Sequence, residues 1–229
     1  WQVQIGLIGG IGPVATDYYY RRLISEFASK DTALEMTIVH ADAPTLLNNL
    51  ECNDVGAQVE IYNRLTDRLV SAGAECVVIT SIAGHFCIDT FKESSPIPVI
   101  DMLTEVNESV KDRELARVGI LGTRTVMQTN FYSGISTAEV IPPIGNALDD
   151  VHSAYVSMAA SGYVTSSQRA VFDSACEWLV REASVDAIML GGTDLTLVYK
   201  GDQTQFPIVD CAAIHVDAVV RHATNSYAD

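Results

Sequence analysis

Two apolar, strand-like runs of the chain end in residues whose types could do chemistry. Ser81 and His85 follow the first run, and Gly192-Thr193-Asp194 follows the second. A serine four residues before a histidine suggests nucleophilic catalysis, with the imidazole as the base. No GxSxG motif surrounds Ser81, so a hydroxyl that caps the next helix is an open alternative.

Three further features have both a functional and a structural interpretation. Thr193 and Asp194 could hold substrate, or could cap the helix that follows them. The Gly9–Pro13 turn (GGIGP) could cradle an anion or be a simple tight turn, and it lacks the GxGxxG and GK[ST] patterns of nucleotide sites. Cys87 could pack in a helix or react. His85 and Cys87 alone are too few ligands for a metal site, so we expect no metal.

Strand-like and helix-like patterns alternate along the chain, which is typical of α/β folds. Apolar runs predict strands at Val3–Ile8, Met36–Ala41, Val77–Thr80, Val118–Leu121, Val140–Pro142, Ala187–Leu190 and Ile208–Val209. Apolar periodicity predicts helices at Val14–Ala28, Val55–Ala72, Val126–Ser133, Ser166–Ala183 and Cys211–Ala223. The runs at Val77 and Ala187 do not alternate with polar residues, so we expect parallel strands that are covered on both faces.

The two halves repeat one plan, which predicts two pseudo-symmetric, Rossmann-like parallel-sheet α/β domains facing a shared cleft. Ser94–Pro98 would link the halves, and a second crossing near Phe206-Pro207 would return the last helix to the first half. The predicted domains are residues 1–98 with 208–229, and residues 99–207. Ligands bind beyond the carboxyl ends of parallel strands, which would place Ser81, Thr123 and Gly192 around the cleft.

Composition limits the partners and the location that we expect. The formal net charge of −15, from 29 acidic and 14 basic residues, argues against nucleic acid and against an anionic membrane. Five cysteines without a CxxC pattern fit a reduced, cytoplasmic protein. No apolar stretch is long enough to cross a bilayer, and Val3–Ile8 is too short for a signal peptide. The chain opens at Trp1, from which we expect a trimmed or replaced start.

Three stretches carry a family resemblance. They are Gly6–Pro13 (GLIGGIGP) with Tyr19-Tyr20 after it, Leu121–Met127 (LGTRTVM) and Asp210–His215 (DCAAIH). Together they resemble the aspartate/glutamate racemase superfamily over essentially the whole chain, and most closely its broad-specificity amino-acid racemase branch. The resemblance implies two similar α/β domains, a homodimer, and catalysis without pyridoxal phosphate, metal or any other cofactor.

The resemblance also implies a mechanism. Racemases of the family use two cysteines, one from each half, on opposite faces of the substrate's α-carbon. One thiolate removes the α-proton while the other thiol donates a proton. The first cysteine opens a Cys-Asn-Thr-x-His motif, where this chain has Ser81–His85 (SIAGH). The second lies in Gly-Cys-Thr-Glu-Leu, where this chain has Gly191–Leu195 (GGTDL). Ser81 and Gly192 therefore stand where the thiols would be.

These replacements argue against the standard two-base racemisation. A glycine has no proton to exchange, and a serine hydroxyl is a far weaker acid than a thiol. An engineered replacement of cysteine would account for Ser81 but not for Gly192. The arginine and lysine that hold a distal carboxylate in the family have no counterparts here, where the matching stretches read Pro44-Thr45-Leu46 and Met158-Ala159-Ala160.

We therefore predict an isomerase-type enzyme of this superfamily that acts on a small amino acid or carboxylate. The predicted catalytic residues are Ser81, His85, Gly192 and Asp194. The predicted substrate-binding residues are Gly9, Gly10, Gly12, Ile82, Ala83, Thr123, Thr125 and Thr193. Ser81 would contact the reacting centre, and His85 would orient its loop or act as a base. A lyase or decarboxylase of the superfamily and a non-catalytic small-molecule-binding pseudoenzyme are open alternatives.

Overall fold

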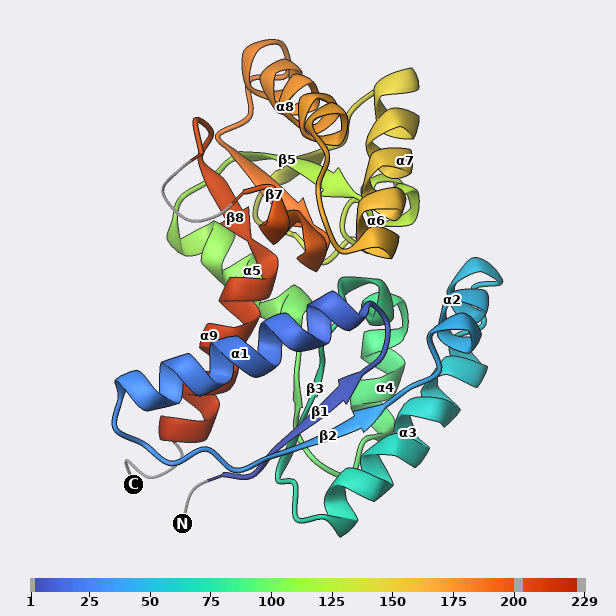
Figure 1. The fold of residues 1–229 in the computed structure, drawn as a ribbon, viewed down its shortest axis with the longest axis vertical. Coiled ribbons are helices and arrows are strands. Elements are labelled where there is room, and N and C mark those ends of the chain that lie inside the picture. Colours follow the sequence, from blue (N-terminus) through green and yellow to red (C-terminus); the bar gives the residue numbers. More distant parts are fainter. Residues whose placement is uncertain (1–2, 200–203, 226–229) are drawn as a thin grey trace. The chain divides into compact units, whose positions relative to one another are not determined.

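The computed structural model describes residues 3–199 and 204–225, and the chain divides into two compact units. The first unit contains the chain up to Asp101 and the residues from His215 onward, and the second contains Met102–Ile214 (Figure 1). In the described residues each unit contains one sheet of four strands, all paired in parallel. The predicted α/β fold with parallel sheets is therefore confirmed.

The sheet of the first unit has the strand order β2-β1-β3-β4. Its strands are β1 (Ile5–Gly9), β2 (Met36–His40), β3 (Cys76–Ile79) and β4 (Val99–Ile100). Its helices are α1 (Pro13–Ser29), α2 (Ala43–Glu51), α3 (Val55–Ser71), the 3-10 helix η1 (Ile82–Cys87), α4 (Ile88–Ser94) and most of α9 (Cys211–Asn225). The chain moves from β1 to β2 in one direction and from β2 to β3 in the other. Right-handed crossovers therefore put α1 and α3 on opposite faces of the sheet (Figure 1).

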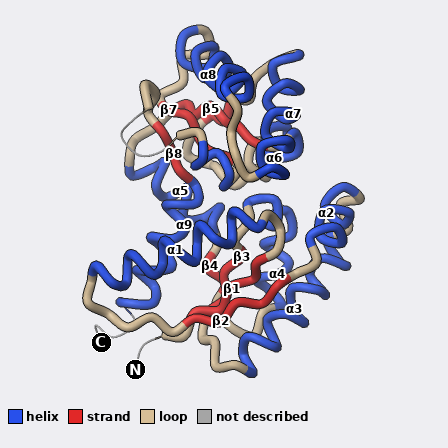
Figure 2. Tube along the Cα trace, viewed as in Figure 1, coloured by secondary structure: helices blue, strands red, loops and turns tan. Residues whose placement is uncertain are grey.

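The second unit repeats this arrangement with the strand order β6-β5-β7-β8. Its strands are β5 (Arg117–Gly122), β6 (Glu139–Ile141), β7 (Ala187–Gly191) and β8 (Ile208–Asp210). Its helices are α5 (Met102–Asp112), α6 (Arg124–Gln128), α7 (Asn146–Ser161), α8 (Ser166–Arg181) and the 3-10 helix η2 (Thr193–Leu197). Helices α7 and α8 pack against each other and against β5 (Figure 2).

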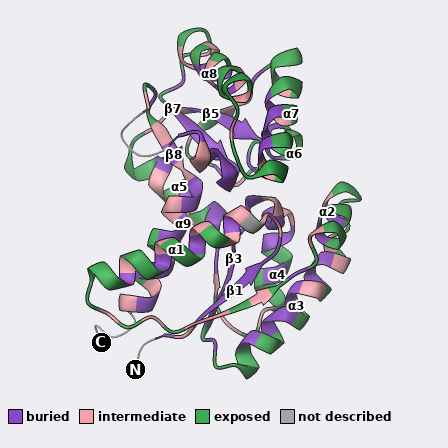
Figure 3. Cartoon of the chain, viewed as in Figure 1, coloured by how far each residue is buried: buried purple, intermediate pink, exposed green. Residues whose placement is uncertain are grey.

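The central strands form the core of each unit. Every residue of β1, β3 and β7 is buried, whereas the edge strands β2 and β6 are partly exposed (Figure 3). A parallel strand that is covered on both faces needs apolar residues without alternation, as the sequence predicts for Val77 and its neighbours. Of the helices in the described ranges, none is long and apolar enough to span a membrane.

The register of the strands fixes which residues emerge together at the carboxyl edge of each sheet. In the first unit Ile8 lies opposite Val39 on one side and Ile79 on the other. In the second unit Gly122 lies opposite Gly191. Thr123 and Gly192, the next residues along the chain, therefore leave the sheet side by side.

Two predicted connections between the halves were wrong. Ser94–Pro98 leads from α4 into β4, which pairs with β3 and so stays in the first sheet. Strand β8 pairs with β7 in the second sheet, and the chain returns to the first unit at His215 rather than near Phe206-Pro207. Prolines mark turns, but they do not indicate which sheet the next strand joins.

The helix predicted at Val126–Ser133 was too long. Helix α6 ends at Gln128, because Asn130–Ser133 all have φ between 50° and 59°, a left-handed conformation that no right-handed helix contains. Helices α2, α5 and α7 lie where the sequence analysis predicts no helix. Of these, α2 has a visible start signal, since the Asp42 carboxylate accepts the N–H of Thr45.

The turn after β1 has no room for side chains at its first two glycines. Gly10 has φ of +121°, and a Cβ on it would collide with the backbone of Ala41, lying 2.9 Å from the nitrogen. A Cβ on Gly9 would lie 2.7 Å from Oγ1 of Thr16. Both positions therefore require glycine for steric reasons that are independent of any ligand.

Gly10→Ala should lower the free energy of unfolding by at least about 2 kcal/mol, through the collision and the unfavourable φ. Gly56→Ala in α3 is the matched control, because a Cβ there meets nothing closer than 3.7 Å. The control should leave stability unchanged or raise it by up to about 1 kcal/mol. Urea unfolding measures both, and equal effects of the two substitutions would contradict this account of the turn.

His215 joins α9, α1 and β4 in the core of the first unit. Its Nε2–H donates to the carbonyl oxygen of Ile100 at 2.8 Å, and Tyr19 Oη donates to its Nδ1 at 2.7 Å. Burial, and to a smaller degree the neighbouring His85, lowers the pKa of His215 from 6.5 to about 3. The fold therefore contains this imidazole in its neutral form.

The stabilisation from neutral His215 should be complete above pH 6.5 and should disappear as the pH falls toward 3, because only the unfolded chain binds the proton in that range. At pH 5 the loss amounts to about 2 kcal/mol. In His215→Gln, the decrease in unfolding free energy between pH 7.5 and 5 should be smaller than in wild type by about this amount. His40→Gln, at an exposed position, is the control. A wild-type pH dependence in His215→Gln would refute the assignment.

Candidate active site

The first candidate surface lies at the carboxyl end of β1, where the glycine turn leads into α1. Gly10 N–H donates to Oγ1 of Thr16 at 3.3 Å, which fastens the turn to the helix. The N–H groups of Ile11 and Gly12 have no hydrogen-bond partner among the described residues, and no side chain caps α1. Free amides at the start of a helix attract anions, so this turn could receive a carboxylate.

Ser81 lies after β3, at the position before η1, but its hydroxyl does not cap that helix. The residue is 8% exposed, and its Oγ has no partner within the described ranges. His85 does not bond this hydroxyl; its Nδ1–H donates to the backbone carbonyl oxygen of Ser81 at 2.7 Å. The structure therefore contains neither arrangement that the sequence suggested for Ser81. Its hydroxyl does not bond His85, and it does not cap the following helix.

His85 holds the turn that carries Ser81. Because a carbonyl accepts from Nδ1–H, the second nitrogen, Nε2, carries a lone pair, and it is buried with no partner among the residues that the structure describes. Burial lowers the pKa of His85, so the ring is neutral at pH 7. Its geometry suits a positioning role, with Ile82 buried beside it and Ala83 half-buried.

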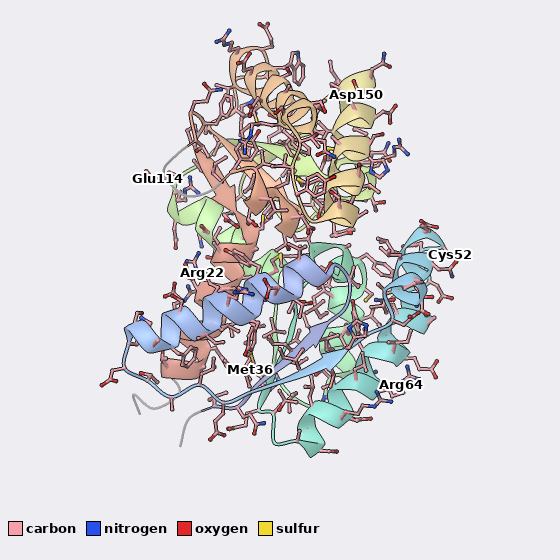
Figure 4. The ribbon with its side chains drawn as sticks, viewed as in Figure 1. Arg22, Met36, Cys52, Arg64, Glu114 and Asp150 are labelled. Carbon is pink, nitrogen blue, oxygen red and sulfur yellow. The ribbon has the colours of Figure 1, made fainter. Side chains whose placement is uncertain are left out.

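Neither predicted thiol position holds a cysteine. Cys87 ends η1 and is 3% exposed, and burial raises the pKa of its thiol to about 12. A thiol with that pKa is protonated at neutral pH, which favours the packing interpretation over a reactive one. Cys52 is exposed at the end of α2 (Figure 4), and Cys76, Cys176 and Cys211 are buried.

The second candidate surface begins at the carboxyl end of β5. Thr123 caps α6, since its Oγ1 accepts an N–H of the first helical turn at 3.3 Å, and Thr125 is exposed on that helix. The sequence analysis did not assign a role to Arg124 between them. Its guanidinium pairs with Asp149 of α7 at 2.7 Å, and its backbone N–H donates to Nδ1 of His152 at 3.1 Å. A cation therefore lies at this strand end.

Tyr155 occupies the space beside Gly192. A Cβ built on Gly192 would collide with the ring of Tyr155 and lie 2.5 Å from both Cζ and Oη. The backbone of Gly192 is extended, with φ of −159°, so the conflict is with the tyrosine and not with the conformation. Tyr155 comes from α7, a helix that the sequence did not predict. The only sequence signal for it was the glycine at position 192, which leaves space for a side chain from another element.

The phenol of Tyr155 is bonded to a buried carboxylate. Its Oη donates to Oδ2 of Asp194 at 2.9 Å. The other carboxylate oxygen, Oδ1, and the hydroxyl of Thr193 are buried and have no partner in the described part of the chain, and neither residue caps η2. Burial raises the pKa of Asp194, and burial together with Asp194 raises the pKa of Tyr155. Polar groups left partly unbonded in a core are uncommon, and they often mark a functional site.

Two other features of the described residues lie outside these surfaces. No group of three or more His, Cys, Asp or Glu side chains in this part of the chain is arranged to hold a metal ion. A cavity of about 590 Å³ is lined by Arg169 and Asp173 of α8, by Leu197–Tyr199 and by Thr204–Phe206. Its polar groups bond within the unit: Arg169 donates to the Val198 carbonyl, and Tyr199 donates to Asp173. The cavity contains none of the predicted site residues.

The sequence profile of the Asp/Glu/Hydantoin racemase family matches residues 8–219. The protein belongs to this family. Its fold is similar to that of a protein from Yersinia pestis assigned as an Asp/Glu racemase, with a TM-score of 0.85, 23% identity, and coverage of 96% of this chain and 99% of that one. An aspartate racemase homologue from Pyrococcus horikoshii has a TM-score of 0.80 and 23% identity to this chain, with coverage of 96% of this chain and 99% of that one. Glutamate racemase from Francisella tularensis in complex with D-glutamate has a TM-score of 0.69 and 16% identity, with coverage of 96% of this chain and 81% of that one.

The two strand ends that the sequence analysis compares with the family motifs carry different groups. The family resemblance of the sequence predicts thiols at Ser81 and Gly192, and the structure has an unbonded hydroxyl at the first. At the second it has no side chain but a phenol from another helix, which takes up the space. The packing around Gly192 leaves no room for a cysteine side chain.

Gly192→Ala should lower the free energy of unfolding by about 1–3 kcal/mol, because the new methyl collides with the Tyr155 ring. In a Tyr155→Ala background the same change should cost close to nothing, although Tyr155→Ala alone costs about 3–5 kcal/mol. A thermodynamic cycle from urea unfolding measures this coupling. Tyr163→Ala, at a residue 63% exposed, is the control background and should give additive effects. Additivity with Tyr155→Ala would rule out the steric conflict.

Proposed function

We propose that this protein is a cofactor-independent isomerase that moves the α-proton of a small amino acid or carboxylate. The observation that carries the proposal is the pair of incompletely bonded groups after β7. Thr193 Oγ1 and Asp194 Oδ1 are buried and have no hydrogen-bond partner among residues 3–199 and 204–225. Buried polar atoms without a partner are uncommon in native folds, and a bound ligand would supply the missing hydrogen bonds. Their position at the carboxyl end of a parallel strand supports a substrate site there.

Backbone amides and hydroxyls would hold the substrate. The free N–H groups of Ile11 and Gly12 support carboxylate binding at the start of α1, with Gly9 and Gly10 keeping the turn open. In the second unit Thr123, Thr125 and Thr193 would supply hydroxyls. Hydrogen bonds to the carboxylate would stabilise the enolate-like charge that forms when the α-proton leaves.

Ser81 would contact the reacting carbon in this proposal. Its unbonded Oγ supports that role, since no internal partner competes for it. Ile82 and Ala83 border it, and His85 would keep its backbone in place through the bond to the Ser81 carbonyl. A serine hydroxyl is a weak acid and base, so the proposal does not depend on symmetric exchange between two thiols.

The relatives support an amino acid as the substrate class. The Francisella tularensis structure contains D-glutamate, and another neighbour is an aspartate racemase from Picrophilus torridus. Arg124 beside Thr123 is a candidate partner for a second, distal carboxylate, provided that it exchanges Asp149 for the ligand.

A binding protein without turnover is the second candidate. The observation that favours it is the absence of a thiol at both Ser81 and Gly192. A lyase or decarboxylase, in which water supplies the proton, would also use the same enolate-stabilising groups.

We also propose that the protein is a cytoplasmic homodimer. This rests on the family resemblance and on four buried, unpaired cysteines in the described ranges. Sedimentation velocity tests the dimer, which should have twice the mass of the chain; a single species of monomer mass would contradict it.

Exchange of the α-proton with solvent tests the isomerase proposal. The protein is incubated in deuterium oxide with each enantiomer of aspartate and glutamate, and with a panel of small amino acids and carboxylates. Mass spectrometry measures deuterium, and chiral chromatography measures configuration. We expect deuterium incorporation with inversion for at least one compound. Loss of carbon dioxide would indicate the decarboxylase, and thermal stabilisation without exchange would indicate the binding protein.

Ser81→Ala should reduce exchange at least about tenfold, because the residue contacts the reacting centre. Ser71→Ala, at an exposed position of α3, is the matched control and should retain wild-type exchange. Equal activity of Ser81→Ala and wild type would remove Ser81 from the mechanism.

A further inference from the structure

We propose that Tyr155, held by Asp194, takes the place of the missing second thiol and exchanges a proton with the α-carbon of the substrate. This inference rests on the isomerase function proposed above and names the group that acts at the end of β7. It concerns residues of the second unit only, and it assigns a catalytic role to a helix, α7, that neither the sequence motifs nor the strand ends suggested.

The position of the phenol is the first argument. Its Oη lies 2.5 Å from where the Cβ of residue 192 would be, closer than any non-bonded contact allows. A side chain beginning at position 192 and the Tyr155 ring therefore exclude each other. The exchangeable group in this space comes from α7 rather than from the strand end, and it is a hydroxyl instead of a thiol.

The chemistry of the pair is the second argument. An apolar residue would fill the space beside Gly192 without the cost of burying a carboxylate. The chain instead places the Tyr155 Oη and Asp194 Oδ2 atoms 2.9 Å apart, and no described residue bonds Oδ1 of the carboxylate. A buried carboxylate with one unsatisfied oxygen lowers the stability of the fold. Its presence here therefore supports a second, functional role for the group.

The electrostatics of the pair determine how a proton would move. Burial raises the pKa of both groups, so a phenolate beside an ionised carboxylate is strongly disfavoured. A relay avoids that state. The phenol gives its proton to the α-carbanion, forming the C–H bond, while protonated Asp194 gives its proton to the phenol oxygen. The products are a neutral phenol and a carboxylate, and the carboxylate recovers its proton from water.

The reverse step uses the same atoms. The ionised carboxylate takes the phenol proton as the phenol oxygen takes the α-proton, and the electron pair of the broken C–H bond moves into the substrate carboxyl group. The two steps balance without any oxidant, reductant or added group. The 2.9 Å separation of Oη and Oδ2 permits either direction of the hydrogen bond.

Exchange from the separate enantiomers tests the inference. Wild type, Tyr155→Phe and Asp194→Asn are compared in deuterium oxide, with the enantiomers of aspartate and glutamate and of any compound active in the panel. Tyr155→Phe should lose exchange about 100-fold or more for the enantiomer whose proton points at Tyr155. The opposite enantiomer should lose at least about tenfold less. Asp194→Asn keeps a hydrogen-bond acceptor but cannot relay a proton, and should show the same enantiomer preference.

Two controls separate a catalytic role from damage to the fold. Tyr163→Phe, at a position 63% exposed, should behave as wild type. Thermal stabilisation of Tyr155→Phe by the active compound should match that of wild type, since the proposed carboxylate-binding amides are intact. The comparison of thermal stabilisation can be made even if the wild-type protein exchanges the α-proton of only one enantiomer.

The outcomes distinguish the two proposals. A wild-type protein that exchanges no α-proton refutes the proposed isomerase, and the role of Tyr155 with it. An active wild type whose Tyr155→Phe variant keeps its rate, or loses both enantiomers equally, refutes the Tyr155 inference alone and leaves the isomerase standing.

Discussion

The Tyr155 ring and a side chain on residue 192 cannot occupy the same space, and the chemistry of the second strand end depends on that exclusion. The backbone of Gly192 is extended and would accept any residue, so the Tyr155 ring, and not the backbone conformation, is what excludes a side chain at this position. Asp194, two residues later, accepts the hydrogen bond of the phenol. Residue 192, Tyr155 and Asp194 therefore pack as one group, and changes at position 192 and at Tyr155 should have coupled effects on stability.

The rest of the fold positions residue 192, Tyr155 and Asp194. Parallel strands that end together bring their next residues to one edge, and small residues at those ends leave space for backbone amides and incoming side chains. In the first unit the same geometry presents the glycine turn and Ser81, with His85 committed to the backbone. Burial does the remaining work, because it keeps the imidazoles neutral and raises the pKa of the Asp194 carboxylate.

Much of the fold was predictable because it depends on local patterns. Continuous apolar runs identify β3 and β7, and glycines at their ends identify the edge where residues emerge. Helix α7 was not predictable in this way. It begins after Gly145, which has φ of 57° and no side chain to cap the helix. The partnership of Tyr155 with Asp194 spans 39 positions in the sequence and has no local signature. At Ser81 and His85 the spacing was visible, but only coordinates reveal that the imidazole bonds a carbonyl and not the hydroxyl.

The most direct test of the central claim is a crystal structure of the wild-type protein with bound aspartate or glutamate. The account predicts that the phenol oxygen of Tyr155 lies within about 3.5 Å of the ligand's α-carbon, the distance of a productive encounter. It also predicts that the hydrogen bond to Asp194 persists. An α-carbon more than about 6 Å from the phenol, out of reach of direct proton transfer, would contradict it.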